Sequence, residues 1–266
     1  MIDFKKYSNP EILDNIADIM SAPQRAPIRI IKWGLAFVVL GFAIDFFLAN
    51  CSNQQTFVTI LTAVISFFMI VIAGVLLGTY LFFRDLNGSI QSLLDYANKL
   101  IHSVIGDVAS AFDSVKTSVN GYQIVLPKGH EIVSGIFVDV INPAAKRCLE
   151  NKIPVIGGFV FRTYSILINA LLKISAVFFS RADKEIDKIV NTQVDKIKDL
   201  ANTPLNIVEN TIDNVWMPKI ADYSNTYIGK AKSYIHKTIF LIATPLLLFM
   251  LALIGATGFL VHFVAA

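Results

Sequence analysis

The stretch from Phe57 to Phe83, FVTILTAVISFFMIVIAGVLLGTYLFF, decides the class of fold. It contains no charged residue, and Arg84 and Asp85 follow it directly. A helix of about 20 apolar residues crosses the hydrocarbon core of a bilayer, which is about 30 Å thick. A helix also gives every backbone polar group an internal partner, which a lipid environment requires. The stretch therefore predicts a membrane-spanning α-helix.

Two other stretches predict the same kind of helix. Residues 30–50 are mostly apolar and carry Lys32 and Trp33 near one end, where a snorkelling amine and an amphipathic ring meet the membrane surface. Residues 238–264 are also apolar and follow Lys237, the last of several basic residues. We therefore expect at least three membrane-spanning helices, the first two of which form a hairpin.

The composition supports this class and argues against others. Of the 266 residues, 55% are hydrophobic and 16% are charged, whereas about 25% of a typical soluble domain is charged. The formal net charge is +3 without a compact run of Lys and Arg, so nucleic acid is not an expected partner. The first apolar stretch is longer than the apolar core of a cleavable signal, about 7–15 residues, so we expect it to be retained.

The basic residues that flank the apolar stretches predict the orientation. Lys and Arg precede the first stretch and follow the second, while the connection at 50–56 has no charge. Such residues accumulate on the cytoplasmic side. The amino terminus is therefore expected in the cytoplasm and the carboxyl terminus at the outer face. An abundance of Ile, Lys, Asn and Phe suggests a low-GC bacterium, so the expected location is the bacterial inner (plasma) membrane.

The segment 153–180 leaves the number of crossings open. Its hydropathy allows a fourth span, but a basic residue near the bilayer centre costs about 2.5–3.5 kcal/mol. The polar residues of the segment share one helix face: Arg162, Ser165, Asn169 and Lys173. Such a helix lies in the membrane interface, packs under the bundle or lines a wet pore. We favour three spans, because a fourth would place the basic residues of 181–237 outside.

The predicted domains follow from these stretches. An amphipathic cytoplasmic segment at 1–29 precedes the hairpin at 30–84. A helical cytoplasmic region at 85–237 contains the interfacial or fourth membrane segment at 153–180. A carboxyl-terminal membrane helix at 238–266 ends the chain. The fold class is therefore an all-α integral membrane protein with long amphipathic cytoplasmic helices.

Two long helices with apolar seams are predicted in the cytoplasmic region. One covers 89–119, and the other continues from the doubtful segment to about residue 202. The seams either pack on each other within one chain or join different chains, as in helix bundles. Between the helices, residues 122–143 are rich in β-branched residues and turn formers, which suggests a short strand or a re-entrant elbow.

Asp45 is the first candidate site residue. It lies inside the first apolar stretch, and an intramembrane carboxylate is a candidate proton or cation ligand or helix-pairing group. In a hairpin with its tip near residues 53–54, it would face Thr59 to Thr62, whose hydroxyls could donate to it. The alternative is that Asp45 reaches water near the headgroups and has no function.

Gly74 and Gly78 form the second candidate site. This small-xxx-small pattern lets two helix backbones approach closely. The contact would lie between chains or within one chain, and such patterns also arise by chance. No catalytic residue, metal site or cofactor is expected, because the four histidines are scattered and phosphate- and dinucleotide-binding motifs are missing.

Two function classes follow. The first is a non-enzymatic membrane protein that acts as a homo-oligomer or as a subunit of a larger membrane assembly, such as a pore, a conduit or a secretion or transfer machine. In a pore, Arg162 and Lys173 would favour anions. The second is a membrane-anchored scaffold or membrane-shaping protein with an interfacial amphipathic helix. A membrane-embedded enzyme is third, because Asp45 alone is too few polar groups.

Overall fold

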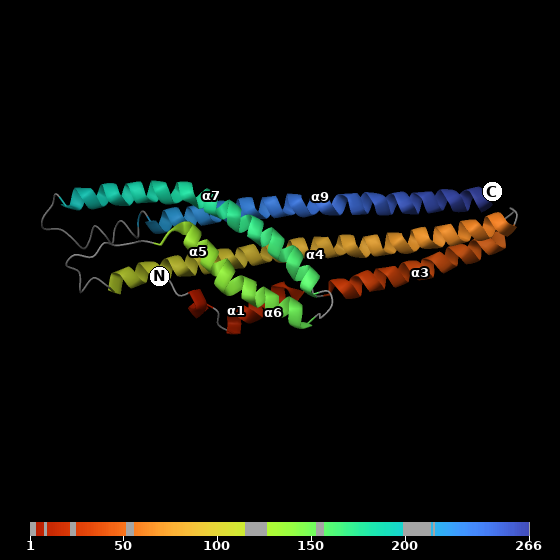
Figure 1. Ribbon diagram of the computed structural model, residues 1–266, viewed down its shortest axis with the longest axis horizontal. Helices are drawn as coiled ribbons and strands as arrows, with labels where there is room; N and C mark the ends of the chain where they lie inside the picture. Colours follow the sequence, from red (N-terminus) through yellow and green to blue (C-terminus); the bar gives the residue numbers. More distant parts are fainter. Residues whose placement is uncertain are drawn as a thin grey trace. The chain divides into compact units, whose positions relative to one another are not determined.

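The structure is a computed structural model that is almost entirely helical (Figure 1). It describes residues 4–7, 10–21, 25–51, 56–114, 127–152, 157–198, 214 and 216–265. The elements are η1 (Phe4–Tyr7), α1 (Pro10–Ile19), α3 (Ala26–Cys51), α4 (Thr56–Ser114), α5 (Gly129–Gly135), η3 (Ile136–Ile141), α6 (Asn142–Lys152), α7 (Gly157–Lys198) and α9 (Met217–Ala265). None of the described residues lies in a β-strand, which confirms the all-α prediction.

Four of these helices are long and apolar enough to cross a membrane. By length and composition they are Ile28–Asn50 in α3, Thr56–Val108 in α4, Val160–Glu185 in α7, and Met217–Ala265, which is α9. Three of them contain the stretches expected to span, and the fourth is the segment that the sequence left open. Length and composition alone therefore add α7 to the candidate spans.

Helices α4 and α9 are longer than the sequence suggested. We expected a span that ends at Arg84 and a separate helix from residue 89, but α4 continues through both positions. The apolar face also continues, since Phe82, Leu86 and Ile90 are all buried at helical spacing. A charged pair changes the polarity of a helix surface and leaves the backbone hydrogen bonds intact, so it ends an apolar stretch without ending the helix.

The chain contacts divide the protein into two compact units. Unit 1 comprises Met1–Met20 and Ile90–Tyr234, and unit 2 comprises Ser21–Ser89 and Ile235–Ala266. Helices α4 and α9 contribute residues to both units.

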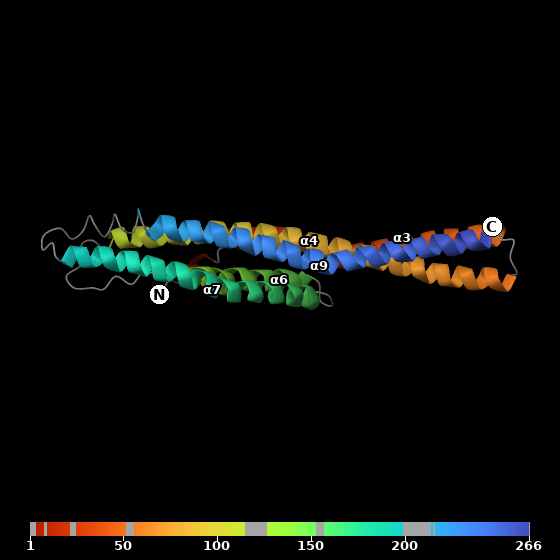
Figure 2. The same cartoon turned by 90° about the horizontal axis from the view of Figure 1, so that it is seen from above.

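Unit 2 contains α3, the first part of α4 and the last part of α9. The carboxyl end of α9 lies at the same end of the unit as the end of α3 and the start of α4 (Figures 1 and 2). At the other end, Arg29 of α3 forms an ion pair with Asp85 of α4. There the Nδ2 atom of Asn87 also lies 3.3 Å from Nδ1 of His236 on α9. The two antiparallel helix pairs are thus held by polar contacts at one end of the unit.

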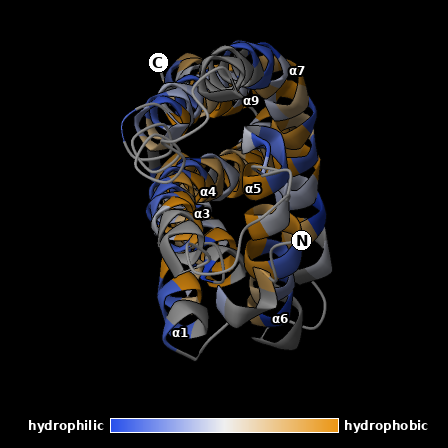
Figure 3. Ribbon diagram, turned by 90° about the vertical axis from the view of Figure 1, so that its left-hand side faces the viewer, coloured by the Kyte–Doolittle hydropathy of each residue, from blue (hydrophilic) through white to orange (hydrophobic). Residues whose placement is uncertain are grey.

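Unit 1 is a bundle of amphipathic helices. The helices α5, η3 and α6 follow one another, α5 and α6 pack against α7, and α1 packs on α6. Hydrophilic and hydrophobic residues alternate around α1, α6 and α7 (Figure 3). The second part of α4 pairs with the first part of α9, where Asn98 donates to Asn225 at 2.7 Å. Tyr227 of α9 donates its hydroxyl to the Leu171 carbonyl of α7 at 2.8 Å.

The first predicted seam is buried inside unit 1. Leu94, Ala97, Ile101 and Val104 are each at most 1% exposed. The part of the seam from Leu94 to Val104 therefore packs within one chain, whereas the side chains beyond residue 108 lie outside the described residues. The side chains of the second predicted seam lie outside the described residues, so its pairing stays a prediction.

The prediction of a strand within 122–143 is wrong for the residues of this range that the structure describes. Residues 129–143 belong to α5, η3 and the start of α6, while residues 122–126 lie outside the described residues. Four β-branched residues on this segment are fully or almost fully buried: Ile132, Val133, Ile136 and Val140. Burial against neighbouring helices outweighs the modest preference of such residues for strands.

A buried carboxylate fixes the start of this helical segment. The Asp183 side chain on α7 is 8% exposed. Its Oδ1 atom accepts from the Gly129 backbone N–H at 2.9 Å, and its Oδ2 lies 3.1 Å from Nδ1 of His130. Backbone donors at a helix start lack partners within the helix. Asp183 therefore adds a second acceptor at this helix start, beside Glu131 of α5 itself, which accepts from the Lys128 backbone N–H at 3.3 Å.

Candidate functional site

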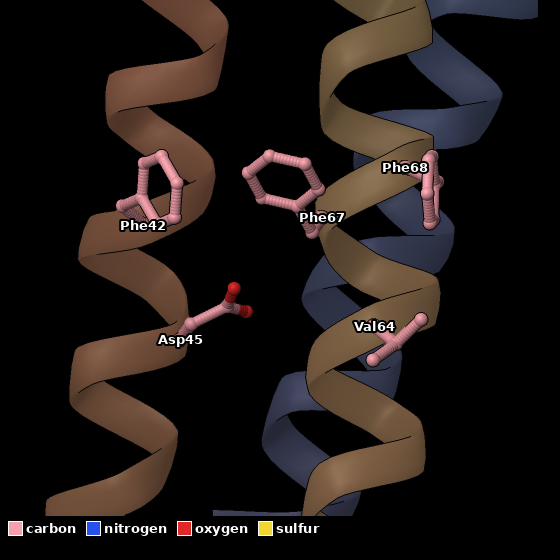
Figure 4. Close-up of a pocket in the computed structure, with 5 residues that line it drawn as sticks. All are labelled: Phe42, Asp45, Val64, Phe67 and Phe68. Atoms are coloured by element: carbon pink, nitrogen blue, oxygen red, sulfur yellow. The ribbon is translucent and has the colours of Figure 1, made fainter.

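Asp45 lies on α3 and points toward α4 (Figure 4). It lines a shallow pocket of about 240 Å³ together with Phe42 of α3 and Val64, Phe67 and Phe68 of α4. The other lining side chains are all apolar. The Oδ1 atom of Asp45 is buried and has no hydrogen-bond partner in the described part of the chain. Burying a carboxylate oxygen without a hydrogen-bond partner in apolar surroundings costs free energy. A donor from outside the described residues would therefore stabilise Asp45.

The hydroxyl donors expected for Asp45 do not line its pocket. Neither Thr59 nor Thr62 is among the lining residues. Thr62 is 7% exposed, and its carbonyl accepts from the Ser66 hydroxyl at 2.7 Å. With about 100° per residue, Val64 lies about 200° around the helix from Thr62. The face of α4 that lines the pocket beside Asp45 is therefore the one that carries Val64, Phe67 and Phe68.

Gly74 and Gly78 face α3 within the same chain. A Cβ atom added at Gly78 would lie 2.6 Å from the Cα of Ile30, and one at Gly74 would lie 2.9 Å from the Trp33 carbonyl oxygen. These distances are shorter than atomic contact allows. The two glycines therefore permit the close approach of α3 to α4, and neither is open to a helix of another chain.

The polar stripe of α7 faces outward. Arg162, Asn169 and Lys173 are exposed and Ser165 is half-buried. The opposite face is buried, with Tyr164 and Ile168 fully covered inside unit 1 and Leu171 nearly so. The stripe is not purely polar, because Ile166 is 62% and Val177 68% exposed among the basic residues. The outer face of α7 thus combines positive charge with apolar side chains.

His262 on α9 is a polar residue that the sequence reasoning did not select. Asp45 is the only Asp, Glu, Lys, Arg or His between residues 33 and 83, and His262 is the only one between 238 and 266. The histidine is exposed, and no hydrogen bond or ion pair of it occurs among the described residues. The sequence feature that could have identified His262 is that the long apolar stretches contain one acid and one imidazole. Neither residue alone gives this indication.

No group of three His, Cys, Asp or Glu side chains that could hold a metal ion occurs in the described ranges. Comparison with protein-family models, with curated proteins and with solved structures gave no match. The function must therefore be argued from the chain's own residues.

Proposed function

We propose that this chain is a non-enzymatic integral membrane protein that acts as a homo-oligomer or as a subunit of a larger membrane assembly. The observation that carries the proposal is the outer surface of unit 2. Large hydrophobic side chains are exposed along all three of its helices: Ile31, Leu35, Val39, Phe42 and Phe46 on α3, Phe57, Ile60, Val64, Phe68 and Ile72 on α4, and Phe240, Leu241, Leu248, Phe249, Phe259 and Phe263 on α9. Soluble monomers rarely expose contiguous apolar patches of this extent, whereas lipid tails cover them at no cost.

The proposed topology has three crossings. They are α3, the first part of α4 and the last part of α9, with the amino terminus and unit 1 in the cytoplasm and the carboxyl terminus at the outer face. We propose that α7 does not cross the hydrocarbon core of the membrane, although it is long enough to do so. A crossing would place the exposed side chains of Arg162, Asn169 and Lys173 in lipid, while its apolar face is already covered within unit 1. The basic residues that flank the spans favour this orientation of the termini. The membrane that we propose is the bacterial inner membrane.

Asp45 supports an assembly role over a simple anchor. An anchor needs only apolar side chains toward lipid, and a carboxylate inside a span destabilises it unless a donor is present. The described part of the chain supplies no partner for its buried Oδ1 oxygen. A helix from another subunit can supply one, which fits a membrane assembly of the kind found in conduits and secretion or transfer machinery.

The topology is tested with cysteine labelling in intact cells. Cys51 lies at the end of α3, and in a Cys148→Ser variant it is the only thiol. We expect it to react with a membrane-impermeant maleimide before lysis. In a Cys51→Ser, Cys148→Ser background, Asp139→Cys at an exposed position of η3 should react only after the membrane is permeabilised. All variants should stay in the membrane after extraction with alkaline carbonate. Recovery in the soluble fraction, or the opposite labelling pattern, would contradict the proposal.

The outer face of α7 favours a second candidate, a membrane-anchored scaffold with an interfacial helix. Exposed Arg162, Lys173 and Arg181 flank the exposed apolar Ile166 and Val177, a combination typical of helices that lie on anionic membranes. Each basic residue near such a surface contributes about 1 kcal/mol. The attraction is screened over about 10 Å at 0.1 M salt and about 3 Å at 1 M.

Binding of vesicles tests this candidate. The full-length protein in nanodiscs of neutral lipid should co-float with vesicles that contain phosphatidylglycerol, and less so at 1 M salt. The Arg162→Gln, Lys173→Gln variant should bind about tenfold or more weakly, because two charges near the surface are lost. The matched control removes two exposed charges elsewhere in unit 1, Lys99→Gln and Lys128→Gln, and should bind as the unchanged protein does. Equal loss in both variants would show only a dependence on net charge.

A further inference from the structure

Asp45 and His262 lie at nearly the same level of unit 2. Gly78 of α4 meets Ile30 of α3, and Gly41 of α3 meets Phe67 of α4, so this antiparallel register places Asp45 level with residue 63 of α4. On the other side, Asn87 of α4 meets His236 of α9, and the same reasoning places His262 level with residue 61. Two residues along a helix correspond to about 3 Å. The only acid and the only imidazole of the apolar stretches are thus at matching depth.

The surroundings of the two residues are complementary. The pocket beside Asp45 has walls of Phe42, Phe67 and Phe68 and a volume of about 240 Å³. A cavity of about 150 Å³ accommodates a benzene molecule, so this pocket has room for an imidazole ring. Around His262, the side chains of Phe259 and Phe263 are 70% and 63% exposed. One surface offers a carboxylate in an aromatic pocket, and the other offers an exposed imidazole with two exposed phenylalanines nearby on the same helix.

We propose that the partner of Asp45 is His262 of a second copy of this chain. This inference rests on the proposed membrane function and deepens it by naming the contact and the partner. A histidine has at least one ring N–H whether it is neutral or protonated, so in either state it can donate to the carboxylate of Asp45, which lines the pocket. Because lipid offers no competing donor, such a contact is favoured between helices within the bilayer.

The contact joins two different surfaces, α3 of one copy and α9 of the next. Two copies can make this contact twice in a symmetric dimer, and a pair that makes it once keeps one unused His262 and one unused Asp45. A head-to-tail contact of this kind either closes into a ring or continues as an open chain of copies.

The test measures Förster transfer between donor- and acceptor-labelled copies of the full chain in phosphatidylcholine vesicles. The unchanged protein should associate. Asp45→Leu and His262→Leu should each associate about 3- to 30-fold more weakly, the range for an interhelical hydrogen bond in lipid. Phe46→Leu, an exposed neighbour of Asp45, is the matched control and should associate as the unchanged protein does.

A mixture of the two variants gives the decisive result. Asp45→Leu copies still carry His262, and His262→Leu copies still carry Asp45, so the two variants should pair with each other more tightly than either variant associates with itself. Failure of the mixture to pair, or unchanged self-association of either variant, would overturn the proposed contact. All variants must remain in the membrane after carbonate extraction. Loss of membrane insertion in the unchanged protein would instead overturn the proposed function.

Discussion

Replacing Gly78 by leucine is expected to force α3 and α4 apart. The first added atom, Cβ, would already lie 2.6 Å from the Cα of Ile30. A backbone atom cannot move aside by changing a rotamer, so a whole helix must shift. Overpacking a close contact costs about 1–3 kcal/mol, and a full leucine at this site should reach the upper end or exceed it. The measurement is the free energy of unfolding in mixed micelles with increasing sodium dodecyl sulfate.

Gly88 provides the control for this substitution. It lies on the same helix, is exposed, and has no atom within 4 Å of an added Cβ. Leucine has a higher helix propensity than glycine, by up to about 1 kcal/mol, so Gly88→Leu should leave stability unchanged or raise it slightly. If Gly78→Leu and Gly88→Leu behaved alike, α3 and α4 would not approach each other at Gly78.

The helical class and the apolar stretches could be predicted from the sequence because both depend on local pattern. A run of apolar residues from Phe57 to Phe83 requires a helix in lipid whatever its neighbours do. The face of α7 could also be predicted, since helical spacing alone separates Arg162 and Lys173 from the buried Tyr164 and Ile168. These features need no knowledge of the tertiary fold.

The features that depend on distant contacts could not be predicted in this way. The acceptor for the Gly129 backbone N–H at the start of α5 is Asp183, more than 50 residues later in the chain. The residues opposite Asp45 depend on the rotation of α4 about its axis, which the sequence pattern leaves undetermined among several apolar faces. For the same reason, His262 could not be connected with Asp45 from the sequence alone. The antiparallel register of α9 is what places the two residues at the same level.

Replacing Leu94 by alanine is expected to destabilise unit 1 by about 2–5 kcal/mol. Leu94 is fully buried in the first seam, so the substitution removes apolar contacts and leaves a cavity. Ser92→Ala, at an exposed position one half-turn earlier on α4, is the control and should change stability by less than about 0.5 kcal/mol. The measurement is urea unfolding of the full chain in a mild detergent, followed by tryptophan fluorescence of the buried Trp216.

Protein concentration separates the two possible roles of this seam. A seam that packs within one chain gives an unfolding midpoint that is independent of concentration, and Leu94→Ala lowers that midpoint by the same amount at every concentration. A seam shared between chains couples folding to association, so both the midpoint and the effect of the substitution would change with concentration. Since Leu94, Ile101 and Val104 are covered inside unit 1, we expect the first result. Asp45 lies in unit 2, away from this seam, so the Asp45→Leu variant should leave the Leu94→Ala effect unchanged.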